Sequence, residues 1–174
     1  MHNLNIIHRN INPKILVLKS NKKIENIKFI DIGFWKYYRN KNGVHIPFKM
    51  YKKMIGKNII FGSVNNLIGF ELSRRDDLIS LSYMLIYFIK GALPWENVKT
   101  KKIEDKIVKI LDIKQNINDD KLAEGLPNEI KLFISYTKKL KFEEDPDYNH
   151  LKNILDIIIK SKDSNKHYYF TLQE

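Results

Sequence analysis

Short apolar runs and polar segments alternate along the first part of this chain. Residues 15–18 (ILVL) and 27–30 (IKFI) are two such runs, and a polar stretch separates them. Short runs rich in β-branched residues and joined by polar residues are typical of two strands connected by a turn. The first part of the chain is therefore predicted to form a small β-hairpin.

Farther along, the apolar positions follow a helical period. Residues 78–89 form a largely apolar run of 12 residues, shorter than the roughly 20 residues of a transmembrane helix. This run predicts a buried core helix and no membrane span. Three later segments repeat apolar side chains three or four positions apart, which predicts amphipathic helices packed on that core. Their stripes are Ile103, Ile107, Ile110 and Leu111; Ile130, Phe133, Ile134 and Thr137; and Leu151, Ile154, Leu155 and Ile158.

The composition limits the chemistry that the chain can carry. Its 174 residues, 43% of them hydrophobic, are enough for one core. The absence of cysteine excludes disulfides, a thiolate nucleophile and a cysteine zinc site. The five histidines show no metal-ligand spacing, and the N-terminus has no signal-peptide pattern. We therefore expect a cytoplasmic or nuclear protein.

The formal net charge of +11 raises the question of an anionic partner. The basic residues are nearly all lysine and are spread along the chain, and lysine, asparagine and isoleucine are abundant together. These three residues have A/T-rich codons, so genome composition explains much of the excess. No motif that combines aromatic residues with arginine appears, and nucleic acid is not predicted as a partner.

The most specific motif stands at 8–15, which read HRNINPKI, and DIG follows at 31–33. Protein kinases carry H-R-D-L-x-x-x-N in the catalytic loop and D-F-G in the metal-binding segment. The two predicted strands lie between these motifs, as they do in a kinase. The chain thus resembles a protein kinase.

Six further blocks are similar, in the same order, to blocks of the casein kinase 1 family. They are KYYR at 36–39, HIPF at 45–48, SVNNLIG at 63–69, SRRDDL at 73–78, GALPWEN at 91–97 and LKFEEDPDYNHL at 140–151. The resemblance implies a protein kinase-like fold of which this chain is the C-terminal lobe, mainly α-helical with a small β-hairpin element. It also implies a truncated C-lobe at 1–160, with a catalytic loop at 8–15, an activation segment at 31–65, a helical core at 76–160 and a C-terminal tail at 161–174.

Three positions of the loop depart from the family pattern. Asn10 replaces the catalytic aspartate, and its amide cannot accept a proton near neutral pH, which typically costs about 100- to 10,000-fold in rate. Asn12 replaces a lysine that neutralises the transferring phosphoryl group, and an amide offers only a dipole there. Ile15 replaces an asparagine that holds the second magnesium ion, and an aliphatic side chain cannot bind a metal. We therefore predict that no catalytic residue is intact and that the chain as it stands is not an enzyme.

Other positions match the family, and the resemblance implies their roles. Asp77 resembles a buried aspartate that braces the catalytic loop through its backbone, and structural roles are also implied for His8, Arg9 and Gly33. Asp31 stands at the family's magnesium position. It is either a weak residual metal ligand or a loop carboxylate that accepts hydrogen bonds from nearby backbone.

The activation segment also differs from the family. Ile60 stands where the family has an arginine of an anion pocket, which puts that pocket in doubt. Lys101 and Lys102 lie near another basic contact of the pocket. They are interpreted either as a weaker anion site or as a solvated helix face.

The residues with which a kinase holds ATP belong to its N-lobe, and none of them can be assigned in this sequence. No cofactor is therefore expected, and ATP and magnesium are expected only if an N-lobe is supplied. A long helix that flanks the core helix in a complete kinase is missing as well. Its absence predicts that part of 78–89 is exposed, a feature that favours a protein partner or self-association.

Three functions remain open. The first is a pseudokinase-like, protein-binding module whose partner is a kinase or a kinase substrate. The second is the C-terminal part of a serine/threonine protein kinase that transfers phosphate from ATP once an N-lobe is supplied. The third is a decaying gene product without a selected role. The chemistry of Asn10, Asn12 and Ile15 favours a binding role over catalysis.

Overall fold

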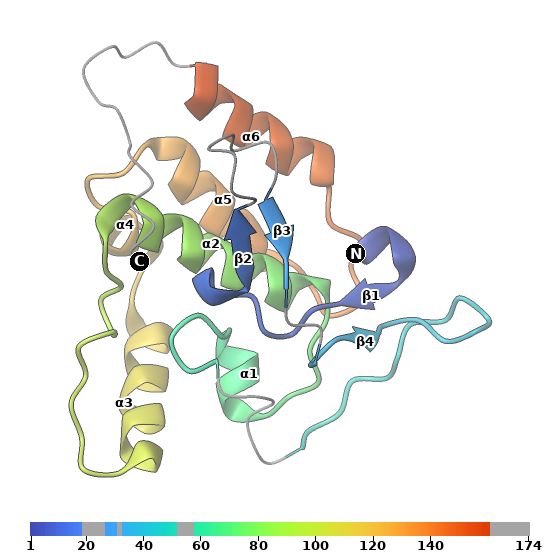
Figure 1. Cartoon of the computed structure of the whole chain (residues 1–174), viewed down its shortest axis with the longest axis horizontal. Coiled ribbons are helices and arrows are strands. Elements are labelled where there is room, and N and C mark those ends of the chain that lie inside the picture. Colours follow the sequence, from blue (N-terminus) through green and yellow to red (C-terminus); the bar gives the residue numbers. More distant parts are fainter. Residues whose placement is uncertain (19–26, 31–32, 52–57, 161–174) are drawn as a thin grey trace.

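The computed structural model describes residues 1–18, 27–30, 33–51 and 58–160. These residues are mainly helical and include two small antiparallel sheets (Figure 1), which confirms the prediction of a mainly α chain with a small β-hairpin. The predicted tail at 161–174 lies outside the described residues. The longer helices are α2 (Arg74–Lys90), α3 (Ile103–Asn116), α5 (Asn128–Lys139) and α6 (Tyr148–Lys160), and the shorter ones are η1 (His2–Leu4), η2 (Pro13–Ile15), α1 (Val64–Ile68) and α4 (Asp119–Leu122).

The predicted hairpin is present, and a second strand pair accompanies it. Strand β2 (Leu16–Leu18) pairs with β3 (Ile27–Phe29) in antiparallel register. Strand β1 (Ile6–Ile7) pairs in the same sense with β4 (Lys36–Tyr37). The sequence did not predict this second pair, because two-residue strands are too short to show a period. The pair joins the segment just before residues 8–15 to the segment that follows the DIG motif.

Helix α2 is the central element (Figure 1), and its ends have clear local causes. At the start, the Asp76 carboxylate accepts a hydrogen bond of 2.9 Å from the backbone N–H of Ser73, which satisfies a donor that the first helical turn leaves free. At the end, Gly91 has φ 80° and donates its N–H to the carbonyl of Tyr87, because this left-handed cap is easily adopted only by glycine. Among the described helices, none is both long enough and apolar enough to cross a bilayer.

Two hydrophobic clusters pack against different faces of α2. One joins Tyr83 and Ile86 to side chains from α3, α4 and α5 and to Trp95. The other joins Leu78 to side chains from α5 and α6. Because these helices cover it, no apolar side chain of α2 is exposed. The expectation that part of 78–89 would be exposed was therefore wrong.

The amphipathic stripes of α5 and α6 are packed as predicted, whereas that of α3 is packed only in part. The four residues of the α5 stripe are all buried, and Leu151 and Ile154 of α6 are buried as well. In α3, Ile110 is fully buried but Ile103 is 53% exposed. The first turns of α3 lie beyond the body formed by α2, α4 and α5 (Figure 1), so that only its second half packs.

A matched pair of substitutions in α5 tests this assignment of the core. Ile134 is fully buried and Leu132 is 49% exposed on the same helix. Ile134→Ala is expected to lower the free energy of unfolding by about 2–5 kcal/mol, because it removes buried methyl groups and leaves a cavity. Leu132→Ala is expected to change it by less than about 1 kcal/mol. Urea denaturation followed by circular dichroism measures both values, and equal losses would contradict the assignment.

Candidate functional site

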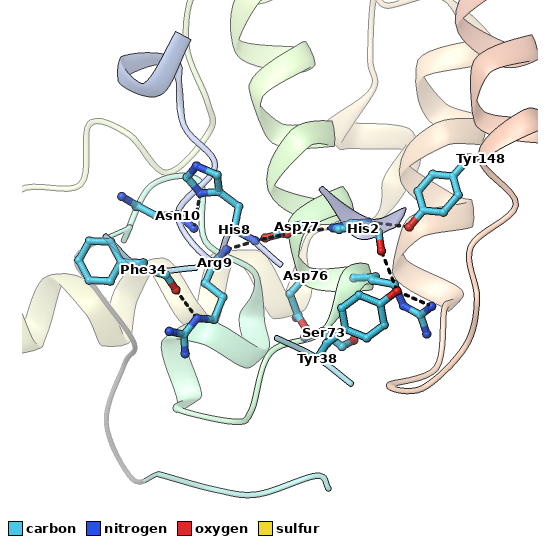
Figure 2. Close-up of polar contacts among 11 residues, drawn as sticks. His2, His8, Arg9, Asn10, Phe34, Tyr38, Ser73, Asp76, Asp77 and Tyr148 are labelled. Atoms are coloured by element: carbon cyan, nitrogen blue, oxygen red, sulfur yellow. Dashed lines mark hydrogen bonds and ion pairs between the residues drawn. The ribbon is translucent and has the colours of Figure 1, made fainter. Parts of the chain in front are cut away.

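The loop at 8–15 follows β1 and is fixed by the carboxylate of Asp77 in the first turns of α2. Asp77 is buried and accepts hydrogen bonds from the backbone N–H groups of His8, at 2.6 Å, and Arg9, at 2.8 Å. It also contacts Nε2 of His2 at 3.0 Å. Figure 2 shows Asp77 between the loop on one side and His2 on the other. These contacts are the ones that a bracing role requires.

Arg9 has an unusual backbone conformation at this point. Its φ is 64°, in the left-handed region that non-glycine residues seldom adopt. The bond from its N–H to Asp77 and a bond from its Nε to the carbonyl of Phe34 hold it there (Figure 2). Burial lowers the pKa of Arg9, and the nearby carboxylate of Glu71 opposes this effect. The side chain links the loop to the segment that follows the DIG motif.

His2 extends the bracing network to α6, which the sequence did not predict. Its Nδ1 lies 2.6 Å from the hydroxyl of Tyr148. Burial raises the pKa of Tyr148, so its hydroxyl stays protonated. In the His2 tautomer with the proton on Nε2, Nδ1 accepts a hydrogen bond from Tyr148 and Nε2 donates one to Asp77. His2 and Tyr148 are 146 positions apart, and no local pattern could have paired them.

The substituted loop positions bond within the loop or belong to the core. Asn10 donates its backbone N–H to Nδ1 of His8 at 3.3 Å. Asn12 donates its side-chain amide to the carbonyl of Asn10 at 2.7 Å, and its Oδ1 accepts from the N–H of Lys14 and caps η2. Ile15 is 2% exposed. The amide of Asn12 therefore orders the loop, and Ile15 cannot reach a metal ion.

The end of the activation segment contacts the loop directly. Asn58 donates its side-chain amide to the carbonyl of Ile11 at 2.9 Å. Beyond it, Ser63 and Asn65 donate to Asp76 at 2.7 and 2.9 Å. Burial raises the pKa of Asp76, and these hydrogen bonds oppose the shift. Helix α2 thus holds the loop through Asp77 and the end of the activation segment through the neighbouring Asp76.

A further buried carboxylate holds β4 and the middle of the activation segment. Glu71 is 1% exposed and accepts from Lys36 Nζ at 2.7 Å and from the Tyr51 hydroxyl at 2.5 Å. The sequence did not predict this network, whose members lie far apart along the chain. Each of the three residue types is common on surfaces, so that no local signal would have found it.

The predicted anion site at Lys101 and Lys102 has no support in the contacts. Both side chains are exposed. Lys101 lines a hollow of about 360 Å³ together with Asp105 and Lys109, so charges of both signs face it. Ile60 is partly buried and packs against the core cluster of Trp95. Lys101 and Lys102 are solvated, but they lie just before α3, with Lys102 as its N-cap, and not on a helix face.

The positions at which a kinase binds magnesium are described only in part. Asp31 lies outside the described residues, and Gly33 is exposed in the turn before β4. The part of the chain that is described holds no group of three histidine and carboxylate side chains that could bind a metal ion. Ile15 lies in the core, and its aliphatic side chain supplies no oxygen ligand for magnesium.

Comparison with known proteins places these features in context. No model of a protein family matches the chain. Among curated proteins, the chain is similar to casein kinase I homolog 2 of Schizosaccharomyces pombe, with 34% identity over 164 residues. The similarity covers 92% of this chain, which spans only 38% of the length of that relative. It supports a kinase-like fold of the casein kinase 1 type.

Replacing Asp77 tests whether it is the main support of the loop. In Asp77→Asn one carboxylate oxygen is replaced by an NH₂ group, which cannot accept a hydrogen bond. At least one of the groups that contact Asp77, on His2, His8 and Arg9, would then lose its acceptor, and we expect the free energy of unfolding to fall by about 1.5–3 kcal/mol. The exposed Asp156 of α6 provides the control, because Asp156→Asn makes the same change in charge and should cost less than about 0.5 kcal/mol. Urea denaturation of both variants measures the difference. A loss in Asp77→Asn no larger than that of the control would contradict the bracing role.

Proposed function

We propose that this chain is the C-terminal lobe of a casein kinase 1-like domain that binds protein and does not itself transfer phosphate. The similarity to casein kinase I homolog 2, the helical architecture and the order of the sequence blocks support the lobe assignment. The chain spans 38% of that relative, so the activity of the whole relative does not carry over by similarity alone.

One observation supports the proposal. The backbone of the loop is held in place by hydrogen bonds, whereas the side chains at positions 10, 12 and 15 lack the groups that phosphoryl transfer requires. Asp77 fixes the backbone at His8 and Arg9, and Asn58 fixes it at Ile11. None of these contacts uses the side chains that would act on a phosphoryl group. A surface with the shape of a substrate site is thereby kept without a general base.

The charge of the chain is compatible with an acidic partner. A net charge of +11 attracts acidic protein and nucleic acid alike, and the absence of a nucleic-acid motif in the sequence favours the protein. The relative is named for casein, and casein is therefore the first protein to test. Attraction between exposed charges is screened within about 8–10 Å at physiological salt, so a contact that survives at 150 mM salt would need complementary surfaces.

Binding and phosphotransfer are measured on the same preparation. We expect the chain to bind dephosphorylated casein at 150 mM salt in isothermal titration calorimetry. Polyglutamate of equal charge should bind at least tenfold more weakly. With ATP and magnesium present, we expect no transfer of labelled phosphate to casein above the background without protein. Equal affinity for casein and polyglutamate would contradict specific binding, and measurable phosphotransfer would contradict the absence of catalysis.

The second candidate function is phosphotransfer in a domain to which an N-lobe is supplied. The fixed backbone at His8 and Arg9 favours it, because a restored aspartate at position 10 would start from an ordered loop. The double variant Asn10→Asp with Asn12→Lys is the cleaner test, since Ile15→Asn would also bury an amide in the core.

When the chain is joined to the N-lobe of an active casein kinase 1, the double variant should raise the rate by about 100-fold or more over the parent, because a general base is restored. Labelled-phosphate transfer to casein measures both rates, and the two substitutions together leave the net charge unchanged, so a gain in rate cannot come from a change in net charge. Measurable transfer by the parent at the rate of the double variant would overturn the predicted inactivity, whereas no transfer by either protein would contradict this second candidate function.

A further inference from the structure

Lys114 of α3 is a buried lysine whose ammonium group lies in a cradle of backbone carbonyls. It is 3% exposed, although lysine is almost never fully buried without a partner. Its Nζ donates to the carbonyls of Ile59 at 3.1 Å, Ile60 at 2.8 Å and Gly62 at 2.6 Å. All three N–H groups of the ammonium thus have an acceptor in one short segment.

Two aromatic rings complete the surroundings of this ammonium. Nζ lies 4.8 Å from the ring centroid of Trp95 and 5.0 Å from that of Tyr83, within the range of cation–π attraction. Trp95 also donates its indole N–H to the carbonyl of Ile60 at 2.8 Å. Among the described residues, no carboxylate forms an ion pair with Lys114. Burying an amino group of lysine without a counter-ion has a high desolvation cost. The hydrogen bonds from Nζ to the carbonyls of 58–62 offset part of this cost, so their loss should have a larger effect than the loss of contacts made by a surface lysine.

The segment at 58–62 is a closed turn that connects α3 to the loop. Within it, Asn58 accepts from the N–H of Phe61 at 3.2 Å and from the N–H of Gly62 at 2.8 Å. A Cβ at Gly62 would lie 2.3 Å from the carbonyl oxygen of Asn58, so only glycine closes this turn without displacement. At its other side, Asn58 reaches the carbonyl of Ile11, next to Asn10. Contacts therefore run from Lys114 through the turn to the candidate site.

We propose that Lys114 is a positioning residue: its Nζ holds the turn at 58–62 against α3 through hydrogen bonds to three backbone carbonyls and thereby sets the protein-binding surface beside the loop at 8–15. The role in binding rests on the proposed function, whereas the hold on the turn does not.

Amide hydrogen exchange of Lys114→Met tests the hold on the turn. The N–H groups of Phe61 and Gly62 should exchange at least tenfold faster in this variant, relative to the amides of α5 in the same protein. Lys109→Met is the matched control, because Lys109 is exposed on the same helix and the charge lost is the same. An equal acceleration in the turn and in α5 would mean that Lys114 only adds global stability, and no acceleration would mean that it holds nothing. Either result overturns the proposal.

A second measurement needs only the unsubstituted chain, in case Lys114→Met does not fold. Burial lowers the pKa of Lys114 well below its ordinary value, and opening the turn would return the group to water. Opening should then take up a proton, so that it becomes less favourable as the pH rises toward the ordinary value of about 10.4.

Tyr83 is the titratable side chain that contacts the ammonium, and burial raises its pKa, so it stays neutral over this range. Protection of Phe61 and Gly62, corrected for base-catalysed intrinsic exchange and relative to α5, should therefore increase between pH 6 and pH 10. Unchanged relative protection would show that opening does not expose Lys114 and would overturn the proposal.

Casein affinity tests the role in binding. Lys114→Met should weaken binding at least tenfold relative to Lys109→Met, which removes the same charge. If both variants bind casein equally, the binding part of the inference is wrong. If the unsubstituted chain does not bind casein at all, the proposed function fails, and hydrogen exchange still decides whether Lys114 holds the turn.

Discussion

The buried carboxylate of Asp77 is the constraint on which the rest of this structure depends. It collects donors from His2, His8 and Arg9, and through His2 it reaches Tyr148 of α6. A buried carboxylate that lost these donors would be strongly destabilising. The first nine residues, the central helix and the last described helix are therefore tied together at one side chain. The candidate site lies at this junction because the loop starts there.

This arrangement separates the shape of the site from its chemistry. Asp77 bonds to backbone N–H groups, which exist whatever side chains follow at positions 10, 12 and 15. Asn12 even contributes to local order by capping η2. Phosphoryl transfer, in contrast, requires a base and metal ligands at those positions. Substitutions there can remove catalysis while the loop keeps its place, which is why loss of catalysis and retention of binding are physically compatible.

The sequence predicted those parts of the fold whose signal is local. The α5 and α6 stripes and the run at 78–89 were long enough to show a period, and the kinase-like motif identified Asn10, Asn12 and Ile15 by position. The β1–β4 pair, the contact of His2 with Tyr148 and the cradle of Lys114 join distant segments, so no window of sequence contains them. A faint signal did exist for Lys114, because it stands four positions after the buried Ile110 and thus on the same helical face.

The strained backbone at Arg9 gives a reason to regard the loop as more than a connection. A non-glycine residue in the left-handed region costs roughly 1–2 kcal/mol, and it persists only where surrounding contacts fix it. Here the contacts come from Asp77 and from the carbonyl of Phe34. An unconstrained connection from β1 to β2 would relax to an ordinary φ. The fold instead keeps Arg9 strained, and the residues that follow are held by Asn58, whose side-chain amide donates to the carbonyl of Ile11.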